Sequence, residues 1–119
     1  MTWKFDDNRS IYAQLVEQIQ IRIMTGVYEA GSKLPSVREL ASEAGVNPNT
    51  MQRALAELEN MGLVHSQRTS GRFVSDDENI VAELKKDFAR KETFAFREKM
   101  HELGYSTEDI IRFIREEEN

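Results

Sequence analysis

The clearest pattern in the chain is a short run of apolar residues at helical spacing, with a helix-start signal before it and a helix-end signal after it. Its apolar positions are Val37, Leu40, Ala41 and Ala44. Residues three and four apart share one face of an α-helix. Ser36 and Glu39 form an S-x-x-E capping box, which satisfies free N–H groups where a helix starts. Gly45 can take the left-handed conformation that ends a helix, so we expect a short amphipathic helix before it.

A second amphipathic helix follows after a tight turn. Asn47 is a typical N-cap residue, and Pro48 suits the first helical position because its missing N–H would have no partner there. The apolar stripe consists of Met51, Ala54, Leu55 and Leu58. Gly62 marks the end of this helix. Two such helices joined by a tight turn predict a helix-turn-helix, a motif that lays its second helix in the major groove of DNA.

The outward face of the second helix carries side chains suited to reading base edges. Opposite the apolar stripe lie Asn49, Arg53, Ala56 and Asn60, with Gln52 beside them. Asn and Gln amides pair with adenine and an Arg guanidinium pairs with guanine in the major groove. A merely solvated face is the alternative, since surface helices are usually polar opposite their core. The capped helix and turn that come first favour DNA recognition.

Two short runs containing apolar residues come next, at residues 63–66 and 72–75, and Gly71 lies between them. They predict a β-hairpin, and a weak strand contact from Lys33-Leu34 would complete a winged helix. Arg68 and Arg72 flank the hairpin loop, where basic side chains can follow phosphates or enter the minor groove. The alternative is that these arginines only keep the hairpin tip soluble.

A further helix is predicted before this region, from Ile11 to Thr25, and Gly26 ends it. Its apolar face consists of Tyr12, Leu15, Val16, Ile19 and Ile23. Helical spacing places these side chains together, so we expect them to complete the core.

The C-terminal 44 residues predict two more amphipathic helices. An S-x-x-E box from Ser75 to Glu78 opens a helix that runs to about Leu103, and Ser106 with Asp109 opens the last one. So short a helix pair cannot bury its apolar side chains alone, so it either folds back on the preceding domain or is shared by two chains. We favour a shared homodimer interface. Its expected residues are Ile80, Leu84, Phe88, Ile110, Ile111 and Ile114.

These motifs resemble the DNA-binding domain of GntR-family bacterial transcription regulators. The resemblance runs from about Ile11 to Ser75 and rests on G-x-K-L-P-S-x-R-E-L followed by G-V-x-x-N-T-x-x-R-A-L-x-x-L-E-x-x-G-L-V. The two-helix tail is similar to that of the YtrA-like subgroup. The resemblance implies a mainly α fold with a small β-hairpin wing. The expected domains are a winged helix-turn-helix in residues 1–75 and a helical dimerisation tail in residues 76–119.

The resemblance also implies where DNA is contacted and what the protein does. The implied DNA-binding residues are Ser36, Arg38, Asn49, Thr50, Arg53, Arg68 and Gly71, to which the residue pattern adds Gln52 and Arg72. Gln52 departs from the many relatives with arginine at this position, and Thr69-Ser70 replaces a common Gly-Lys pair in the wing. The implied function is a repressor that binds an inverted-repeat operator as a homodimer.

The net charge of −5 is unevenly divided along the chain. Residues 1–75 carry eight basic and eight acidic side chains, whereas residues 76–119 carry eight and thirteen. The expected DNA-binding half is therefore neutral. Phosphate affinity depends on where the cations lie rather than on net charge. The cations expected to converge are Lys33, Arg38, Arg53, Arg68 and Arg72.

The sequence contains no residue pattern that indicates an enzyme, a metal site or a cofactor. His65 and His101 lack metal-ligand spacing, and the acidic runs at residues 76–78 and 116–118 are interpreted as helix-end charge. The lack of cysteine, of a signal peptide and of a long apolar segment leads us to expect a cytoplasmic protein with no membrane partner. The alternatives are a winged-helix protein-interaction module and a sensor that binds a small-molecule effector between its tail helices.

Overall fold

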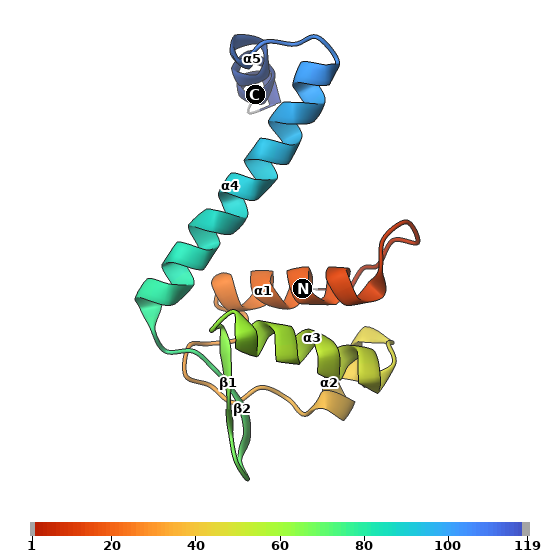
Figure 1. Cartoon of the computed structure of the whole chain (residues 1–119), viewed down its shortest axis with the longest axis vertical. Helices are drawn as coiled ribbons and strands as arrows, with labels where there is room; N and C mark the ends of the chain where they lie inside the picture. Colours follow the sequence, from red (N-terminus) through yellow and green to blue (C-terminus); the bar gives the residue numbers. More distant parts are fainter. Residues whose placement is uncertain (1, 118–119) are drawn as a thin grey trace. The chain divides into compact units, whose positions relative to one another are not determined.

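The computed structural model describes residues 2–117, so Glu118 of the acidic C-terminal run lies outside the described residues. The elements in chain order are α1 (Ile11–Met24), α2 (Val37–Ala44), α3 (Pro48–Asn60), β1 (Val64–Gln67), β2 (Gly71–Val74), α4 (Glu78–Glu102) and α5 (Thr107–Glu117) (Figure 1). They form two compact units, Met1–Ala82 and Glu83–Asn119. The mainly helical architecture with a β-hairpin confirms the expected fold class.

The first unit is built around α3, which packs against α1, α2 and β1. The largest fully buried apolar side chains come from the three helices, from the residue just before β1 and from β2. They are Leu15, Ile19, Leu40, Met51, Leu55, Leu58, Leu63 and Val74. Burial of each such side chain contributes about 1.5–3 kcal/mol. The predicted apolar face of α1 is confirmed only in part, because Tyr12 and Val16 are half-buried and not fully buried.

The helix-turn-helix forms with the expected caps. The Ser36 hydroxyl oxygen accepts a hydrogen bond from the Glu39 backbone N–H at 3.1 Å, and the Glu39 carboxylate accepts one from the Ser36 N–H. Gly45 has φ 71° and ends α2 in the left-handed conformation. Asn47 then caps α3 by accepting from the backbone N–H of Asn49 at 2.7 Å. These local bonds fix the turn that sets the two helices against each other.

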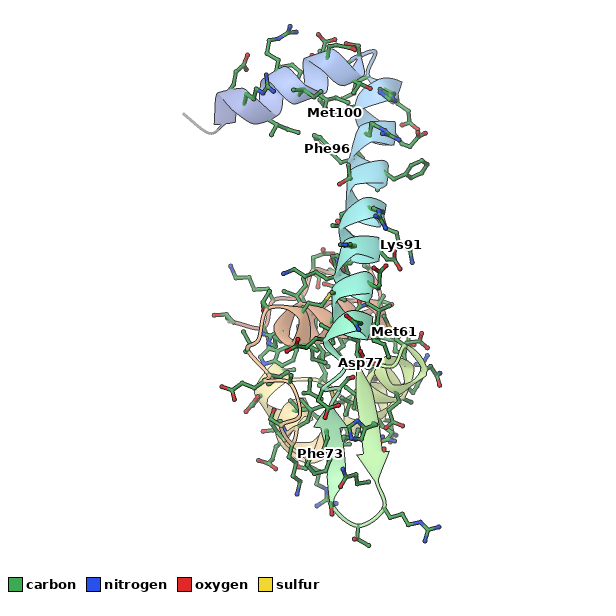
Figure 2. All side chains as sticks on the ribbon, turned by 90° about the vertical axis from the view of Figure 1, so that its left-hand side faces the viewer. Met61, Phe73, Asp77, Lys91, Phe96 and Met100 are labelled. Carbon is green, nitrogen blue, oxygen red and sulfur yellow. The ribbon has the colours of Figure 1, made fainter. Side chains whose placement is uncertain are left out.

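The wing is an antiparallel hairpin in which His65 pairs with Phe73 and Ser66 pairs with Arg72. Its strands reach one residue further toward the tip than expected, which leaves a three-residue turn. The expected third contact is present, because Lys33 forms an antiparallel bridge with Phe73, the residue labelled on the hairpin in Figure 2. Only the base of the hairpin is anchored in the core, while its outer part extends into solvent.

An N-terminal arm, residues 2–9, covers a second face of α1 that the apolar pattern did not predict. The Gln14 side chain pairs with the backbone of Asp6, accepting from its N–H and donating to its carbonyl, both at 2.8 Å. The Arg22 guanidinium carbon lies 3.6 Å from the centroid of the Trp3 ring. Gln14 and Arg22 are each 2% exposed, so α1 buries polar as well as apolar side chains.

The start of α4 differs from the expected S-x-x-E box. The backbone N–H of Ser75 donates to the carbonyl of Leu63 at 2.9 Å, so Ser75 continues the pairing at the base of the wing, and α4 begins only at Glu78. Asp77, labelled in Figure 2, caps α4 instead, and its carboxylate accepts from the backbone N–H groups of Asn79 and Ile80. The prediction of a cap at Ser75 was therefore wrong by two residues.

The second unit contains most of α4 and all of α5. The expected box between Ser106 and Asp109 is confirmed, since the Ser106 hydroxyl oxygen accepts from the Asp109 N–H at 3.1 Å. Tyr105 contacts Phe113 edge to face, with ring centroids 5.1 Å apart. Among the described residues of α4 none is buried, and in α5 only Ile110 is. This unit therefore has very little core within one chain.

Candidate nucleic-acid interface

The outward face of α3 presents polar side chains at the start of the helix. Asn49, Gln52 and Arg53 are exposed and Thr50 is half-buried, whereas the whole apolar stripe of α3 faces the core. The N-terminal end of a helix carries a partial positive charge, which favours nearby anions. The structure thus brings the expected recognition residues to one surface, with their amide and guanidinium groups free to reach a ligand.

Arg53 is held by an aromatic ring from another helix. Its guanidinium carbon lies 4.5 Å from the centroid of the Tyr12 ring in α1, within the range of a cation–π contact. The ring is half-buried while Arg53 remains exposed. The ring therefore restricts the guanidinium without removing it from solvent. Sequence reasoning placed Tyr12 in the core and missed this contact, because helical periodicity says nothing about pairs between separate helices.

A shallow groove lies between the start of α2 and the wing. Its lining includes Lys33, Pro35, Ser36 and Arg72. The Ser36 hydroxyl oxygen caps α2, which leaves its O–H proton available to a ligand. Ser36 and Arg72, expected to bind DNA from separate segments, thus meet around one groove. Arg38, the second residue of α2, is exposed.

The tip of the wing combines an exposed cation with a glycine that the backbone requires. Arg68 is exposed in the turn after β1. Gly71 has φ 101°, and a Cβ atom built on it would lie 3.1 Å from the Lys33 Cε atom. A larger residue would be strained in this conformation and crowded by the lysine. The shape of the turn therefore accounts for Gly71 without a role in binding, and its expected DNA contact stays a prediction.

Arg72 is engaged within the chain. Its Nε atom donates to Glu59 Oε1 at 2.6 Å, and the Ser66 hydroxyl donates to the same oxygen at 2.7 Å. The hydrogen bond from Ser66, together with the hydrogen bond and positive charge of Arg72, lowers the pKa of Glu59 below its ordinary value of 4.5. Glu59 is thus ionised at neutral pH, and its negative charge offsets part of the positive charge of Arg72.

Glu59 itself was not predicted as a site residue. The sequence contained one usable signal, because Glu59 falls in the last turn of α3 just before a hairpin with hydroxyl and guanidinium side chains. The pairing depends on the register of the hairpin, which aligns Ser66 with Arg72. Periodicity alone does not give that register.

The apolar residues expected to form a dimer interface differ in exposure. Ile80, Ile111 and Ile114 are 41%, 43% and 52% exposed, respectively. Leu84 and Phe88 are half-buried. Ile110 differs from the rest because it is 5% exposed, so the chain itself covers it and little of its surface is left for a partner.

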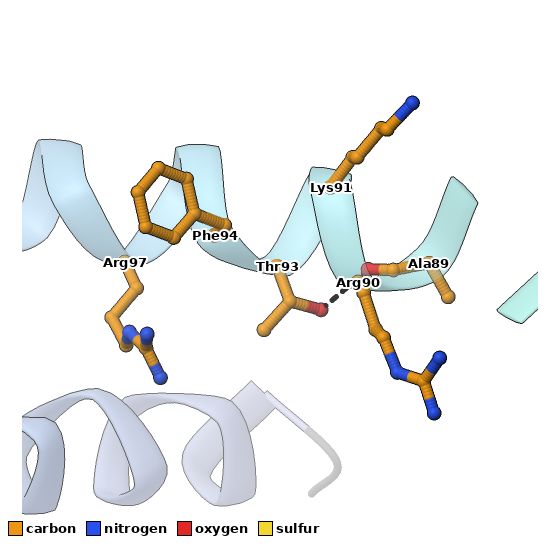
Figure 3. A pocket seen from close by; sticks show the side chains of 6 residues that line it. All are labelled: Ala89, Arg90, Lys91, Thr93, Phe94 and Arg97. Carbon is orange, nitrogen blue, oxygen red and sulfur yellow. Dashed lines mark hydrogen bonds between the residues drawn. The ribbon is translucent and has the colours of Figure 1, made fainter. Parts of the chain in front are cut away.

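A basic surface hollow lies along α4 in the second unit (Figure 3). Its lining consists of Ala89, Arg90, Lys91, Thr93, Phe94 and Arg97. The Thr93 hydroxyl donates to the carbonyl of Ala89 at 2.8 Å, so it turns back onto its own helix. All six lining residues are exposed and come from a single helix. The expected effector site between the tail helices therefore stays a prediction.

The part of the chain that the structure describes shows neither a metal site nor a membrane-spanning helix. Residues 2–117 contain no group of three or more His, Cys, Asp or Glu side chains placed to hold a metal ion. Within the same residues, every helix is too short or too polar to cross a membrane. The surface formed by α2, α3 and the wing, with its exposed amide and guanidinium groups, is therefore the candidate functional site.

Comparison with known sequences agrees with this site. Residues 11–74 match the family described as bacterial regulatory proteins, gntR family. Over 112 residues the chain is 38% identical to the uncharacterized HTH-type transcriptional regulator YhcF of Bacillus subtilis (strain 168), covering 94% of this chain and 93% of that protein. It is 32% identical over 107 residues to the HTH-type transcriptional repressor YtrA of the same organism, covering 89% and 82%.

Solved structures show the same relationship. A GntR family transcriptional regulator from Listeria monocytogenes has a TM-score of 0.89 and 43% identity, covering 94% of this chain and 98% of that one. The structure of AraR(DBD) in complex with operator ORX1 has a TM-score of 0.54 and 31% identity, covering 60% and 93%. These relatives are transcription regulators and not enzymes. With its helix-turn-helix and wing inside the matched residues, the chain belongs to the GntR family of DNA-binding bacterial transcription regulators.

Proposed function

We propose that this chain is a repressor that binds an inverted-repeat operator as a homodimer. One observation carries the proposal: the exposed groups of Asn49, Gln52 and Arg53 lie together at the start of a helix whose opposite face is buried. A helix placed in the major groove presents its N-terminal side chains to base edges. There the two amides would select adenine and the guanidinium would select guanine.

Further contacts would fix the register of α3 on the duplex. Ser36 and Arg38 lie at the start of α2, where a helix N-terminus and a cation suit a phosphate. Arg68 at the wing tip would reach the backbone or the adjacent minor groove. Thr50, Gly71 and Arg72 complete the proposed set, with Arg72 acting partly through its bond to Glu59.

The exposed C-terminal helices support the homodimer. Over 25 residues α4 has no buried side chain, and Ile111 and Ile114 leave apolar surface on α5. A second copy of the chain would cover this surface by two-fold symmetry. The same symmetry would place two α3 helices in successive major grooves, about 10 base pairs apart.

Repression is proposed because the relative YtrA is named a transcriptional repressor. A dimer that occupies an operator excludes other proteins from the same DNA, which needs no further domain. The place of action would be the bacterial cytoplasm, where the operator lies.

Selection of random DNA with the purified full-length protein, followed by footprinting on the promoter of its own gene, tests the proposal. We expect an inverted repeat with half-sites about one helical turn apart. Arg53→Ala should cost about 1–3 kcal/mol and relax the preference at one base, whereas Arg38→Ala should weaken all sequences equally. Arg90→Ala on α4 is the matched control, with the same change of charge far along the chain from the proposed contacts. Unchanged affinity and preference in Arg53→Ala would refute the docking of α3.

A further inference from the structure

We propose that Glu59 is a positioning residue that holds the wing against the recognition helix α3. It would thereby fix the position of Arg68, at the wing tip, relative to the side chains of α3 that read the DNA. This inference rests on the proposed function, since it assigns a role within the same interface. Glu59 would not touch DNA; it would act through the hairpin.

The geometry supports a link between three elements. Glu59 lies in the last turn of α3, while Ser66 lies on β1 and Arg72 on β2. Both residues donate to the same carboxylate oxygen, Oε1, at 2.7 Å and 2.6 Å. Ser66 and Arg72 are directly opposite each other in the hairpin. A single side-chain oxygen atom on the recognition helix therefore binds both strands of the wing, at one pair of opposite residues.

The bonds to Glu59 act on the part of the hairpin that lies outside the core. Val64 and Val74 anchor the base of the wing in the core, being 2% and 1% exposed. Beyond them, every residue from 65 to 73 is exposed or half-buried. A two-stranded hairpin is marginally stable by itself in water. On the other side of the wing, the backbone N–H of Leu34 donates to the carbonyl of Arg72 at 2.9 Å. The bonds to Glu59 tie both strands to α3 through side chains, just before the turn that carries Arg68.

The charge of Glu59 makes the inference testable. An acidic side chain near a DNA-binding surface repels phosphate, so a purely electrostatic view predicts tighter binding when it is removed. The positioning role predicts weaker binding, because a wing that moves must be ordered when DNA binds. The Glu59 and Arg72 side chains are 30% and 18% exposed, so solvent only partly weakens their interaction.

The test compares Glu59→Ala with Glu59→Gln in gel retardation on the selected operator. Both changes remove one negative charge, but glutamine keeps a carbonyl oxygen that can accept from Ser66 and Arg72. We expect Glu59→Ala to bind about 5- to 10-fold more weakly and Glu59→Gln to stay within about twofold of the wild type. Glu57→Ala, on the same helix, is the matched control and should bind as tightly as the wild type or more tightly.

A double-mutant cycle with Arg68→Ala shows whether Glu59 acts through the wing. In the Arg68→Ala background, Glu59→Ala should cause little further loss, because the contact that it positions is already gone. Ser66→Ala removes one of the two donors to Glu59 at an exposed position and should cause a smaller loss of operator affinity. This variant tests the same role if Glu59→Ala does not fold.

Two outcomes overturn the role of Glu59 while leaving the proposed function intact. One is Glu59→Ala binding the operator as tightly as the wild type. The other is full additivity of the Glu59→Ala and Arg68→Ala losses. If the wild-type protein itself selects no DNA, the proposed function fails first, and the role of Glu59 fails with it.

Discussion

At the scale of single residues, the candidate site depends on contacts that fix charged side chains before DNA arrives. Arg53 lies over the ring of Tyr12, and Arg72 is bonded to Glu59. Ordering a long side chain on binding costs about 0.5–1.5 kcal/mol, so a side chain that is already restricted binds with less loss of entropy. The charged residues of this site are therefore best understood together with their neighbours.

We predict that the ring of Tyr12 supports recognition by Arg53. Tyr12→Leu should weaken operator binding by about 0.5–1 kcal/mol, the worth of an exposed cation–π contact, and relax the preference at the base that Arg53 reads. Tyr12→Phe keeps the ring and should retain most of the affinity. Binding of each variant to the selected operator and to single-base variants of it would measure both effects. If Tyr12→Phe loses as much as Tyr12→Leu, the hydroxyl and not the ring carries the effect.

The lowered pKa of Glu59 predicts a pH dependence of stability. The hydrogen bond from Ser66 and then the interaction with Arg72 favour the ionised form in the folded state. The stabilisation is therefore complete above the ordinary value of 4.5 and is lost as the pH falls through the lower folded value. Unfolding free energies of the wild type and Glu59→Gln should differ by about 1 kcal/mol or less at pH 7. That difference should shrink below about pH 4.5; a difference constant from pH 7 to pH 3 would contradict this assignment.

At the scale of elements, sequence predicts what is local. The caps at Ser36 and Asn47 and the apolar stripes of α2 and α3 follow from residues a few positions apart. The structure has them where expected, except that Val37 at the start of α2 is half-buried. The start of α4 was misplaced because Ser75 is held by Leu63, a partner outside its own segment. The same reason explains why the contacts of Glu59 were missed. Interactions between elements depend on a register that periodicity does not contain.

The N-terminal arm gives a prediction at this scale. Gln14 is 2% exposed and makes two hydrogen bonds with the backbone of Asp6. Gln14→Leu keeps a side chain of similar size but leaves those backbone groups without their partner. We expect a loss of about 1–3 kcal/mol in the free energy of unfolding, measured by urea denaturation. The control is Gln52→Leu, the same change at an exposed position of α3, which should cost little.

Equal costs for the two glutamine variants would mean that the arm adds nothing to the stability of the first unit. A selective loss in Gln14→Leu would instead identify the arm as part of the domain that carries the recognition helix. The apolar pattern of α1 does not predict this contribution, because it depends on the polar side chain of Gln14 and on the contact between Trp3 and Arg22.

At the scale of the whole molecule, the C-terminal helices decide how many recognition helices act together. Ile114 is 52% exposed, so in an isolated chain Ile114→Glu should change stability by less than about 0.5 kcal/mol. In a homodimer sharing this surface, the same change would bury unpaired charge at the interface and should yield monomers. Val27→Glu is the matched control, because Val27 is 49% exposed and lies outside the C-terminal helices. Sedimentation at micromolar concentration would separate the two states.

The salt dependence of operator binding should change with the assembly. A dimer that makes about six to eight phosphate contacts should show a slope of about −5 to −7 for the logarithm of affinity against the logarithm of salt concentration. Half as many contacts in the Ile114→Glu monomer should give about half that slope, along with a large loss of affinity, since the second half-site no longer adds its effective concentration. The net charge of −5 does not oppose phosphate binding by the DNA-binding domain, because the acidic excess lies in residues 76–119. A wild type that sediments as a monomer, or a variant that keeps the full slope, would refute a homodimer formed through the exposed face of α5.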